Sequence, residues 1–339
     1  ALVIAEDGSL ADEILFLSPF EERFLIWEGE RLAPGPAAEE KTGIRSTAPL
    51  PAEDTPAAWA AVLAEHHQGG PLHVLPGTAV PAGDDGTAPF QLADGALRTA
   101  LDHLRLVKSE YELACLRNAI DITCAGLFEA MAAARPGGWE YHAPAALEAT
   151  FLRLGAERAG FPSICGAGIN TVVLHYAANR GPLAEGDLLV MDVGAKYRYY
   201  CADVTRTIPV SGRFTPRQRE IYELVLAAQS AAAEAARPGM TLRDLHAVAR
   251  GVLEEAGYAQ YFMHGTSHWL GLDVHDVGGN VPIEVGSVFT IEPGIYIRDE
   301  ALGVRIEDDY LMTEDGALRL STGVPSDPDT LEALLTSLR

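Results

Sequence analysis

Cysteine is scarce in this sequence, whose 339 residues include only four: Cys115, Cys124, Cys165 and Cys201. No two of them form a CxxC pair or the spacing of a zinc ribbon, which excludes the common cysteine-based metal sites. Cys115 and Cys124 are too far apart for a disulfide within the helix that we expect there. Reduced, buried thiols, typical of a cytosolic protein, are therefore expected.

Positive charge and long apolar runs are also scarce. Lysine and arginine number 25 against 48 aspartates and glutamates, so the formal net charge is −23. That charge argues against a polyanionic partner such as nucleic acid or an acidic membrane surface. No stretch approaches the roughly 20 apolar residues of a membrane span, and no secretory signal is expected at the first residues. We expect an acidic cytoplasmic protein that binds neither nucleic acid nor membrane.

Length and composition are sufficient for two domains, or one large one, with a sizeable core. Residues 1–100 are rich in proline, glycine and alanine and predict a small α/β N-terminal domain. Its expected elements are strands at residues 1–5, 14–17, 24–27 and 72–75 and a helix at residues 57–66. Residues 101–339 carry stronger patterns and form the second predicted domain.

The second predicted domain opens with two helices and continues with strands. Ser109 and Glu112 form a capping box, and apolar residues then recur at the helical period up to the Arg-Pro-Gly at 135–137. The elements expected after it are a helix at residues 143–154 and strands at residues 172–175, 188–193 and 199–210.

The same order then returns about a hundred residues later. Thr215 and Gln218 form another capping box, and a second Arg-Pro-Gly follows at 237–239. The elements expected after it are a helix from Thr241 to Gly257 and strands at residues 289–291, 295–297 and 304–306. This repeated order predicts a duplicated α+β unit with internal pseudo-twofold symmetry.

Five side chains suited to metal binding interrupt apolar, β-prone runs of this domain: Asp192, Asp203, His268, Glu292 and Glu307. An acid in such a run is expected to be buried, and a buried charge must be paired or must hold a metal. Four carboxylates without matching cations carry the charge that two divalent ions balance. Two such ions can share a water and lower its pKa toward about 7, so the set predicts metal-assisted hydrolysis.

Strand geometry supports this grouping. Asp192 and Asp203 are expected to share one sheet face across a hairpin turn at residues 195–198. The other acids of these segments are expected to be ordinary salt bridges or turn caps: Asp273, Asp276, Asp308 and Asp309. The substitution Asp308→Asn is accordingly expected to be mild.

Five ordered strings carry a resemblance to a known family: VLHYAANR, VMDVGAKYRYYCADVTRTIPVSGRFTPRQREIY, FMHGTSHWLGLDVHDVG, FTIEPGIYI and GVRIEDDYLMTEDG. The segment that contains them resembles the proline-specific peptidases of the pita-bread fold, above all aminopeptidase P. For residues 101–339 this implies a pita-bread fold with a curved antiparallel sheet. The string FLIWEGERL is similar to part of the smaller domain of those enzymes, whose opening segment is expected to be truncated here.

The resemblance implies a role for each candidate residue. Asp192 would chelate one metal, Asp203 and Glu307 would bridge two, and His268 and Glu292 would complete the second site. Glu292 would also be catalytic, because it is placed to manage the proton of the attacking hydroxide. The residues expected to bind substrate are His175, His264, His275, Tyr296 and Arg305, and the three histidines would also be catalytic by stabilising the tetrahedral intermediate.

The implied activity is that of an Xaa-Pro aminopeptidase, which uses a hydroxide activated by two metal ions on peptides with proline at the second position. We expect Mn²⁺, with Co²⁺ and Zn²⁺ as alternatives, and a homo-oligomer, either dimer or tetramer. One alternative is an Xaa-Pro dipeptidase, although HGTSHWLG is more similar to aminopeptidase P than to the HGLGH-type strings of dipeptidases. A methionine aminopeptidase is disfavoured by the string HWLGLDVHD and by the extra N-terminal domain. The alternative from another class is a non-catalytic pita-bread module that binds proteins, which the complete ligand set disfavours.

Overall fold

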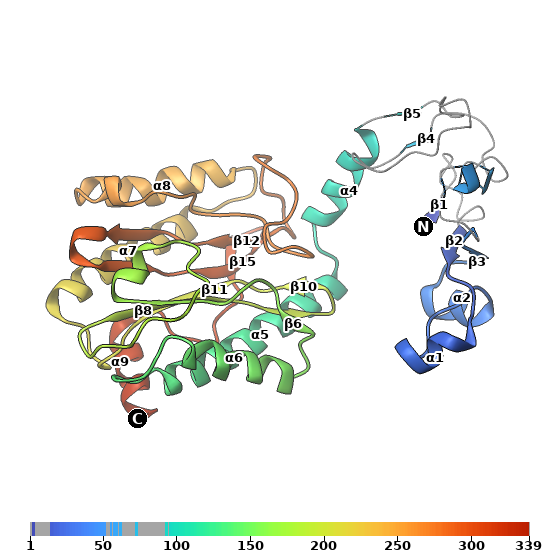
Figure 1. Ribbon diagram of the computed structural model, residues 1–339. Helices are drawn as coiled ribbons and strands as arrows, with labels where there is room; N and C mark the ends of the chain where they lie inside the picture. Colours follow the sequence, from blue (N-terminus) through green and yellow to red (C-terminus); the bar gives the residue numbers. More distant parts are fainter. Residues whose placement is uncertain are drawn as a thin grey trace. The chain divides into compact units, whose positions relative to one another are not determined.

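The computed structural model describes residues 2–3, 14–51, 55, 57–59, 61–62, 72–73, 92–93 and 95–338. The chain divides into two compact units, Ala1–Thr99 and Ala100–Arg339 (Figure 1). Among the described residues, no helix is both long and apolar enough to cross a membrane. The four cysteines are free and buried, as predicted.

The first unit combines short strands with short helices. Its three-stranded sheet has the order β1-β2-β3, in which β2 (Ile14–Leu17) is antiparallel to β1 (Leu2–Val3) and parallel to β3 (Ser46–Pro49). The other elements of this unit are the helices α1 (Glu22–Glu28) and α2 (Pro36–Thr42) and the parallel strands β4 (Leu72–His73) and β5 (Leu92–Ala93).

One of the strand predictions for this unit is wrong. Residues 24–27 lie in helix α1, because a short apolar run alone does not distinguish a strand from a helix and the flanking glutamates favour the helix. The strand at residues 14–17 is confirmed, and residues 57–59 and 61–62 are helical as expected. Beyond Leu2–Val3 and Leu72–His73, the strands expected at residues 1–5 and 72–75 lie outside the described residues, as does the rest of the expected helix at 57–66.

The second unit begins with the end of α4 (Ala96–Leu106), followed by two packed helices and two sheets. α5 (Glu110–Ala133) starts at the predicted capping box, in which the Ser109 hydroxyl accepts a hydrogen bond from the Glu112 N–H. α6 (His142–Arg153) confirms the second helix. The sheet β11-β8-β7 contains β7 (Ile164–Ala167), β8 (Leu188–Val193) and β11 (Val204–Pro209), and the sheet β10-β9-β6 contains β6 (Arg158–Ala159), β9 (Ala195–Tyr197) and β10 (Tyr200–Cys201). Both sheets are antiparallel.

The strand expected at residues 172–175 is wrong. Gly168–Val172 forms the short 3₁₀ helix η2, and the strand in this part of the chain is β7 instead. The backbone of Thr171 lies so close to Gly303 that a Cβ there would be 2.2 Å from the Thr171 carbonyl oxygen. This tertiary contact overrides the β propensity of the run.

The last part of the second unit repeats the order of two helices followed by strands. α7 (Pro216–Ala235) starts at the second predicted capping box, and α8 (Leu242–Glu255) follows it. The antiparallel sheet β12-β15-β16 contains β12 (Val288–Ile291), β15 (Asp308–Thr313) and β16 (Gly316–Arg319). The remaining elements are β13 (Gly294–Ile297) paired with β14 (Leu302–Arg305), the short 3₁₀ helices η3 (Ala259–Tyr261) and η4 (Arg298–Glu300), and α9 (Pro328–Ser337).

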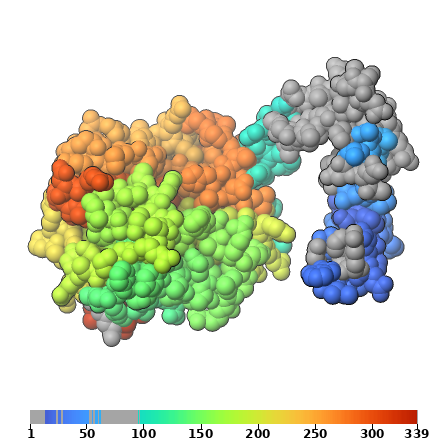
Figure 2. Space-filling model, in the orientation of Figure 1, coloured from blue at the N-terminus to red at the C-terminus, as the bar shows by residue number. Residues whose placement is uncertain are grey.

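The strands of the second unit lie between helices. Figure 1 shows α5 and α6 on one side of the strands and α8 on the other, and segments from the two halves meet on the face drawn in Figure 2. Fully buried apolar side chains from both halves, such as Leu127, Leu147, Val225 and Phe289, belong to one core. Each such side chain contributes about 1.5–3 kcal/mol on burial, so the core fixes the strands that carry the predicted ligands.

Candidate metal centre

One cavity of about 270 Å³ brings together nearly all of the predicted site residues. Its lining consists of Leu174, His175, Asp192, Asp203, His264, Gly265, Ser267, His268, His275, Glu292, Arg305 and Glu307. Tyr296 lies behind this lining, where its hydroxyl accepts from Arg305 Nη1 at 3.0 Å and donates to His264 Nε2 at 2.8 Å. The roles that the resemblance assigns to these residues stay predictions.

The first half supplies Asp192 from strand β8 and Asp203 from the position immediately before the neighbouring strand β11. In the antiparallel pair of β8 and β11, Asp192 lies directly opposite Thr205. Asp203 precedes Thr205 by two residues, so its side chain leaves the same face of the sheet. This register explains why both aspartates reach one cavity.

The hairpin turn between these two acids differs from the prediction. Residues 195–197 form strand β9, and Tyr197 pairs with Tyr200 of β10. The turn itself consists of Arg198 and Tyr199, whose φ values of +48° and +72° are of the left-handed kind that suits a tight hairpin. The sequence did not reveal this turn because neither residue is a typical turn residue.

The second half supplies two acids from breaks between strands. Glu292 directly follows β12, and Glu307 separates β14 from β15. The backbone N–H of Glu292 donates to Thr266 O at 2.7 Å, and that of Glu307 donates to Thr205 O at 3.1 Å. These bonds tie both acids to the segments that carry the histidine and aspartate candidates.

His268 presents an unprotonated nitrogen to the acids. Its Nδ1 lies 3.1 Å from Trp269 O, which can only accept, and burial lowers the pKa of His268 to about 4. The ring is therefore neutral at pH 7, with its lone pair on Nε2. Nε2 lies 3.4 Å from Asp203 Oδ2, 3.7 Å from Glu292 Oε1 and 3.8 Å from Glu307 Oε1. A lone pair that faces three ionised carboxylates is repelled, and a cation or a proton among them removes that repulsion.

The cavity holds more negative than positive charge. Arg305 is the one lysine or arginine in its lining, and Arg305 Nη2 donates to Asp192 Oδ2 at 2.7 Å. The Oδ1 atoms of Asp192 and Asp203 are buried and have no hydrogen-bond partner among the described residues. Buried acceptors without a donor are costly, and a bound cation is one of the causes that explain them.

Burial hinders ionisation of the remaining carboxyls. Burial first, and then the charge of Glu307, raises the pKa of Asp203 well above its usual range, and the same two causes raise the pKa of Glu292. Burial and then Asp192 raise the pKa of Glu307 to about 8. Divalent cations would offset this penalty, since carboxylates bind metals in the deprotonated form. Four carboxylates and one neutral imidazole are thus a donor set that fits two divalent ions. In three of these residues, Asp203, His268 and Glu307, one ligand atom each lies within 4.8 Å of the other two.

Three further histidines line the same cavity. The rings of His275 and His268 lie 4.1 Å apart between centroids, and burial followed by His175 lowers the pKa of His275. Burial and then Arg305 lower the pKa of His264 to about 4. His264 Nδ1 donates to Gly265 O at 2.7 Å. Fixed imidazoles of this kind can contact a bound carbonyl or carboxylate.

The acids outside the ligand set have different environments. Asp273 and Asp276 both pair with Arg105, as the salt-bridge prediction expects. Asp309 departs from that prediction: it is fully buried, accepts from the Asp203 N–H at 3.2 Å, and has no ion pair with the described residues.

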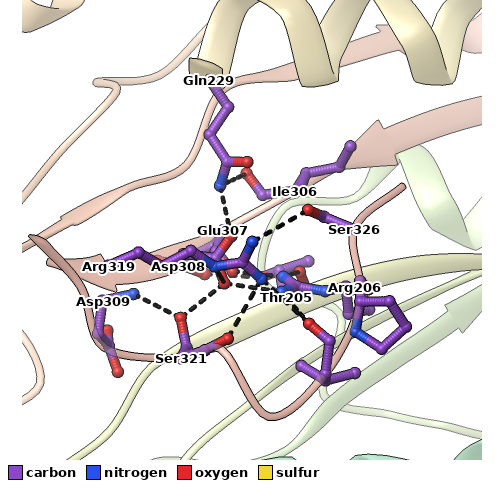
Figure 3. A network of polar contacts seen from close by, with 12 residues as sticks. Thr205, Arg206, Gln229, Ile306, Glu307, Asp308, Asp309, Arg319, Ser321 and Ser326 are labelled. Carbon is purple, nitrogen blue, oxygen red and sulfur yellow. Dashed lines mark hydrogen bonds and ion pairs between the residues drawn. The ribbon is translucent and has the colours of Figure 1, made fainter. Parts of the chain in front are cut away.

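Asp308 forms a salt bridge, as expected, but the sequence did not indicate that the pair is buried. It pairs with Arg206 Nη2 at 2.7 Å, and both side chains are 0% exposed (Figure 3). A mild effect of Asp308→Asn is therefore no longer expected, because the substitution would leave a buried guanidinium without its counter-ion. The missed signal is that Arg206, like the predicted ligands, interrupts an apolar strand.

Residues 114–314 match metallopeptidase family M24. The chain belongs to this family. Membership in a family of metallopeptidases agrees with a donor set that fits divalent ions.

Several proteins are similar over most of the chain. Xaa-Pro aminopeptidase of Escherichia coli is 38% identical over an alignment of 284 residues, and the match covers 75% of this chain and 64% of that protein. Xaa-Pro dipeptidase of Pyrococcus furiosus is 40% identical over an alignment of 223 residues, and the match covers 64% of each chain. The solved structure of zinc-substituted E. coli aminopeptidase P in complex with product matches with a TM-score of 0.86 and 32% identity, over 96% of this chain and 83% of that one.

These matches confirm the predicted pita-bread fold, because aminopeptidase P structures superpose on nearly the whole chain. The chain spans less than two thirds of the length of the Xaa-Pro aminopeptidases that it matches.

Proposed function

We propose that this chain is an Xaa-Pro aminopeptidase, which hydrolyses the bond between an N-terminal residue and a following proline. The observation that carries the proposal is the neutral Nε2 of His268 facing Asp203, Glu292 and Glu307 in one cavity. Such a donor set belongs to hydrolytic metal sites. The 38% identity to an Xaa-Pro aminopeptidase supports this substrate class among the activities that one fold can host.

Five residues would hold two divalent ions: Asp192, Asp203, His268, Glu292 and Glu307. We propose Mn²⁺, with Co²⁺ and Zn²⁺ as alternatives that suit the same donors. Such ions, when bound, polarise a carbonyl oxygen and lower the pKa of water. Asp203 and Glu307 are the proposed bridging ligands, Asp192 the proposed ligand of the first ion, and His268 and Glu292 those of the second.

Metal-assisted hydrolysis suits the chemistry of an Xaa-Pro bond. An Xaa-Pro bond is a tertiary amide without an N–H, so it cannot be recognised through a backbone donor. Glu292, whose Oε2 lies 3.6 Å from His264 Nδ1, would accept the proton of the attacking water and return it to the proline nitrogen. His175, His264 and His275 would bind the peptide and stabilise the charge that develops on its carbonyl oxygen.

Arg305 and Tyr296 would act on the peptide mainly through other side chains. Arg305 is held by Asp192, and the Tyr296 hydroxyl is shared between Arg305 and His264. We therefore propose that this pair orients His264 toward the substrate, in addition to the substrate contact that the resemblance implies.

A peptidase assay tests the proposal. An Xaa-Pro-Yaa tripeptide should release its first residue in the presence of Mn²⁺, lose turnover after treatment with a chelator, and regain it when Mn²⁺ is restored. An Xaa-Ala-Yaa peptide is the matched control and should be cleaved poorly. Absence of any release from Xaa-Pro-Yaa peptides across Mn²⁺, Co²⁺ and Zn²⁺ would overturn the proposal.

An Xaa-Pro dipeptidase is the second candidate, and the 40% identity to an archaeal Xaa-Pro dipeptidase favours it. The same ligands would serve that activity, so the difference lies in whether the pocket admits a residue after proline. Turnover of an Xaa-Pro dipeptide together with none of the tripeptide would select this candidate.

We also propose that the protein acts in the cytoplasm as a homodimer or homotetramer and binds neither nucleic acid nor membrane. The net charge of −23 supports the last two points, because polyanionic partners would be repelled. Light scattering on the purified chain would test the oligomer, and a monomer at micromolar concentration would contradict it.

A further inference from the structure

Two proposed metal ligands lie at places where the sheet is interrupted. β12 ends at Ile291, immediately before Glu292, and Ile306 lies between β14 and β15, immediately before Glu307. Where a regular ladder stops, buried backbone carbonyls need donors from elsewhere. The conformation of the backbone at these breaks decides where both carboxylates point.

A single side-chain amide contacts both breaks. Gln229 of helix α7 is buried, and its Nε2 donates to Ile291 O at 3.1 Å and to Ile306 O at 3.3 Å. The same nitrogen donates to Asp308 Oδ2 at 3.0 Å (Figure 3). All three partners can only accept, which fixes the orientation of the amide with its NH₂ group toward the sheet.

Arg206 holds the same region from strand β11. Its Nη1 donates to Thr205 O at 2.8 Å and to Glu307 O at 2.7 Å, while its Nη2 pairs with Asp308. Asp308 therefore connects the amide of Gln229 to the guanidinium of Arg206. Neither Gln229 nor Arg206 lines the cavity, so neither is a candidate to touch substrate.

We propose that Gln229 is a positioning residue that fixes the spacing of Glu292 and Glu307 by holding the carbonyls of Ile291 and Ile306. This inference rests on the proposed metal site. Loss of the amide donor leaves two carbonyls and the Asp308 carboxylate short of a hydrogen bond. The spacing of the two breaks then depends on backbone contacts such as the pairing of Ile291 with Asp308 and the 3.4 Å bond from the Ile306 N–H to Pro293 O, which hold it less tightly. The binding of divalent ions weakens as a result, although every proposed ligand is still present.

The test compares Gln229→Met with Gln218→Met, each in the full chain. Methionine is close to glutamine in size and has no N–H donor. Gln218 is the matched control, because it is also a buried glutamine of α7 whose Nε2 donates to a single backbone carbonyl, Gly186 O at 2.8 Å, away from the cavity. Titration calorimetry with Mn²⁺ measures metal affinity, and thermal unfolding in chelator measures the stability of each metal-free protein.

We expect Gln229→Met to weaken Mn²⁺ binding by about 10-fold or more, the usual effect of removing a group that supports a metal ligand. With Xaa-Pro-Yaa peptides at saturating Mn²⁺, kcat should fall while KM changes little, since no substrate contact is removed. Gln218→Met should lower the melting temperature without changing metal affinity. If Gln229→Met does not fold, Gln229→Glu carries the test, because a protonated glutamic acid keeps one of the two donor hydrogens and should show an intermediate loss of affinity.

The outcomes separate this inference from the proposed function. Wild-type Mn²⁺ affinity in Gln229→Met, or an equal loss in Gln218→Met, would overturn the positioning role and leave the peptidase proposal standing. A loss of Mn²⁺ affinity in Gln229→Met but not in Gln218→Met would support the positioning role. If the wild-type protein cleaves no Xaa-Pro peptide in the same experiment, the peptidase proposal is overturned while the positioning role stands.

Discussion

Arg305 Nη2 lies 2.7 Å from Asp192 Oδ2, and both side chains are largely withdrawn from water. The pair gives one of the four cavity carboxylates a fixed counter-ion. The other three, Asp203, Glu292 and Glu307, have no lysine or arginine within ion-pair distance in the part of the chain that the structure describes. The stability of the protein should therefore depend on bound cations at these three acids and on Arg305 at the fourth.

Arg305→Met should destabilise the metal-free protein more than the metal-loaded one. Removing one partner of a buried ion pair costs about 3–5 kcal/mol, because the other charge stays buried and unpaired. Divalent ions at the neighbouring ligands would compensate the charge of Asp192. Denaturant unfolding in chelator and in Mn²⁺ measures the difference, and an equal loss in both conditions would contradict it.

The stability of the metal-free protein should fall between pH 5 and pH 8. The pKa of Glu307 rises from 4.5 to about 8 on folding, so the native state holds this proton through a range in which the unfolded chain has lost it. Stability falls with pH wherever the native state binds more protons, and Asp203 and Glu292 act in the same direction. The lowered pKa values of His264 and His268 act in the opposite direction, but only below about pH 6.5, where an unfolded histidine is protonated. The three carboxyls act over the wider range up to about pH 8, so the net change from pH 5 to pH 8 is a fall in stability. Urea midpoints at pH 5 and pH 8 in chelator test this, and a higher midpoint at pH 8 would refute it.

Added Mn²⁺ should reverse that pH trend. Ligands must lose their protons to bind, so metal affinity rises with pH and stabilises the native state most at pH 8. Repeating the two urea midpoints with excess Mn²⁺ gives the comparison. A downward trend of the same size with and without Mn²⁺ would argue against the proposed ligands.

Asp203→Asn should abolish nearly all peptidase activity, with a loss of about two orders of magnitude or more, because it removes a proposed bridging charge. The fold should persist, since asparagine has the same shape. In chelator at pH 8 the variant should be more stable than wild type, because a buried carboxyl that resists ionisation is gone. Circular dichroism, kcat/KM and urea midpoints check the three points, and wild-type turnover in Mn²⁺ would rule out a bridging role.

Arg206→Met should be much more destabilising than Arg219→Met. Arg206 and Asp308 are 0% exposed, whereas Arg219 and Glu223 are 33% and 53% exposed. Loss of the buried partner should cost about 3–5 kcal/mol and loss of the exposed one about 1 kcal/mol or less. Urea unfolding of the metal-free variants measures both, and similar losses would show that Asp308 finds sufficient compensation from Arg319.

The helices of the second unit could be predicted, and its five candidate ligands could be selected, because their signals are local. The capping boxes of Ser109 and Thr215 lie where α5 and α7 begin. The ligand candidates could be selected because each interrupts an apolar run, and the cavity contains all five. That the five side chains meet in space was inferred from charge balance and from family resemblance, because they lie in separate segments of the sequence.

The features that escaped prediction depend on contacts between distant segments. Arg206 and Asp308 are 102 residues apart, and only the topology of the sheets brings them together. The contact of Thr171 with Gly303 likewise turns a β-prone run into a 3₁₀ helix. Residues 24–27 were mispredicted for a local reason, since a short apolar run is compatible with both a strand and a helix.

Gln229 and Arg206 donate hydrogen bonds to backbone carbonyls at the interrupted strands, and neither residue lines the cavity. The residues that support the backbone at the breaks are thus separate from the residues that line the cavity. Exchange of the acidic side chains for neutral ones should end the proposed hydrolysis but leave the backbone around the cavity in place. A few substitutions should therefore suffice to turn the proposed enzyme into a protein that holds a peptide without cutting it.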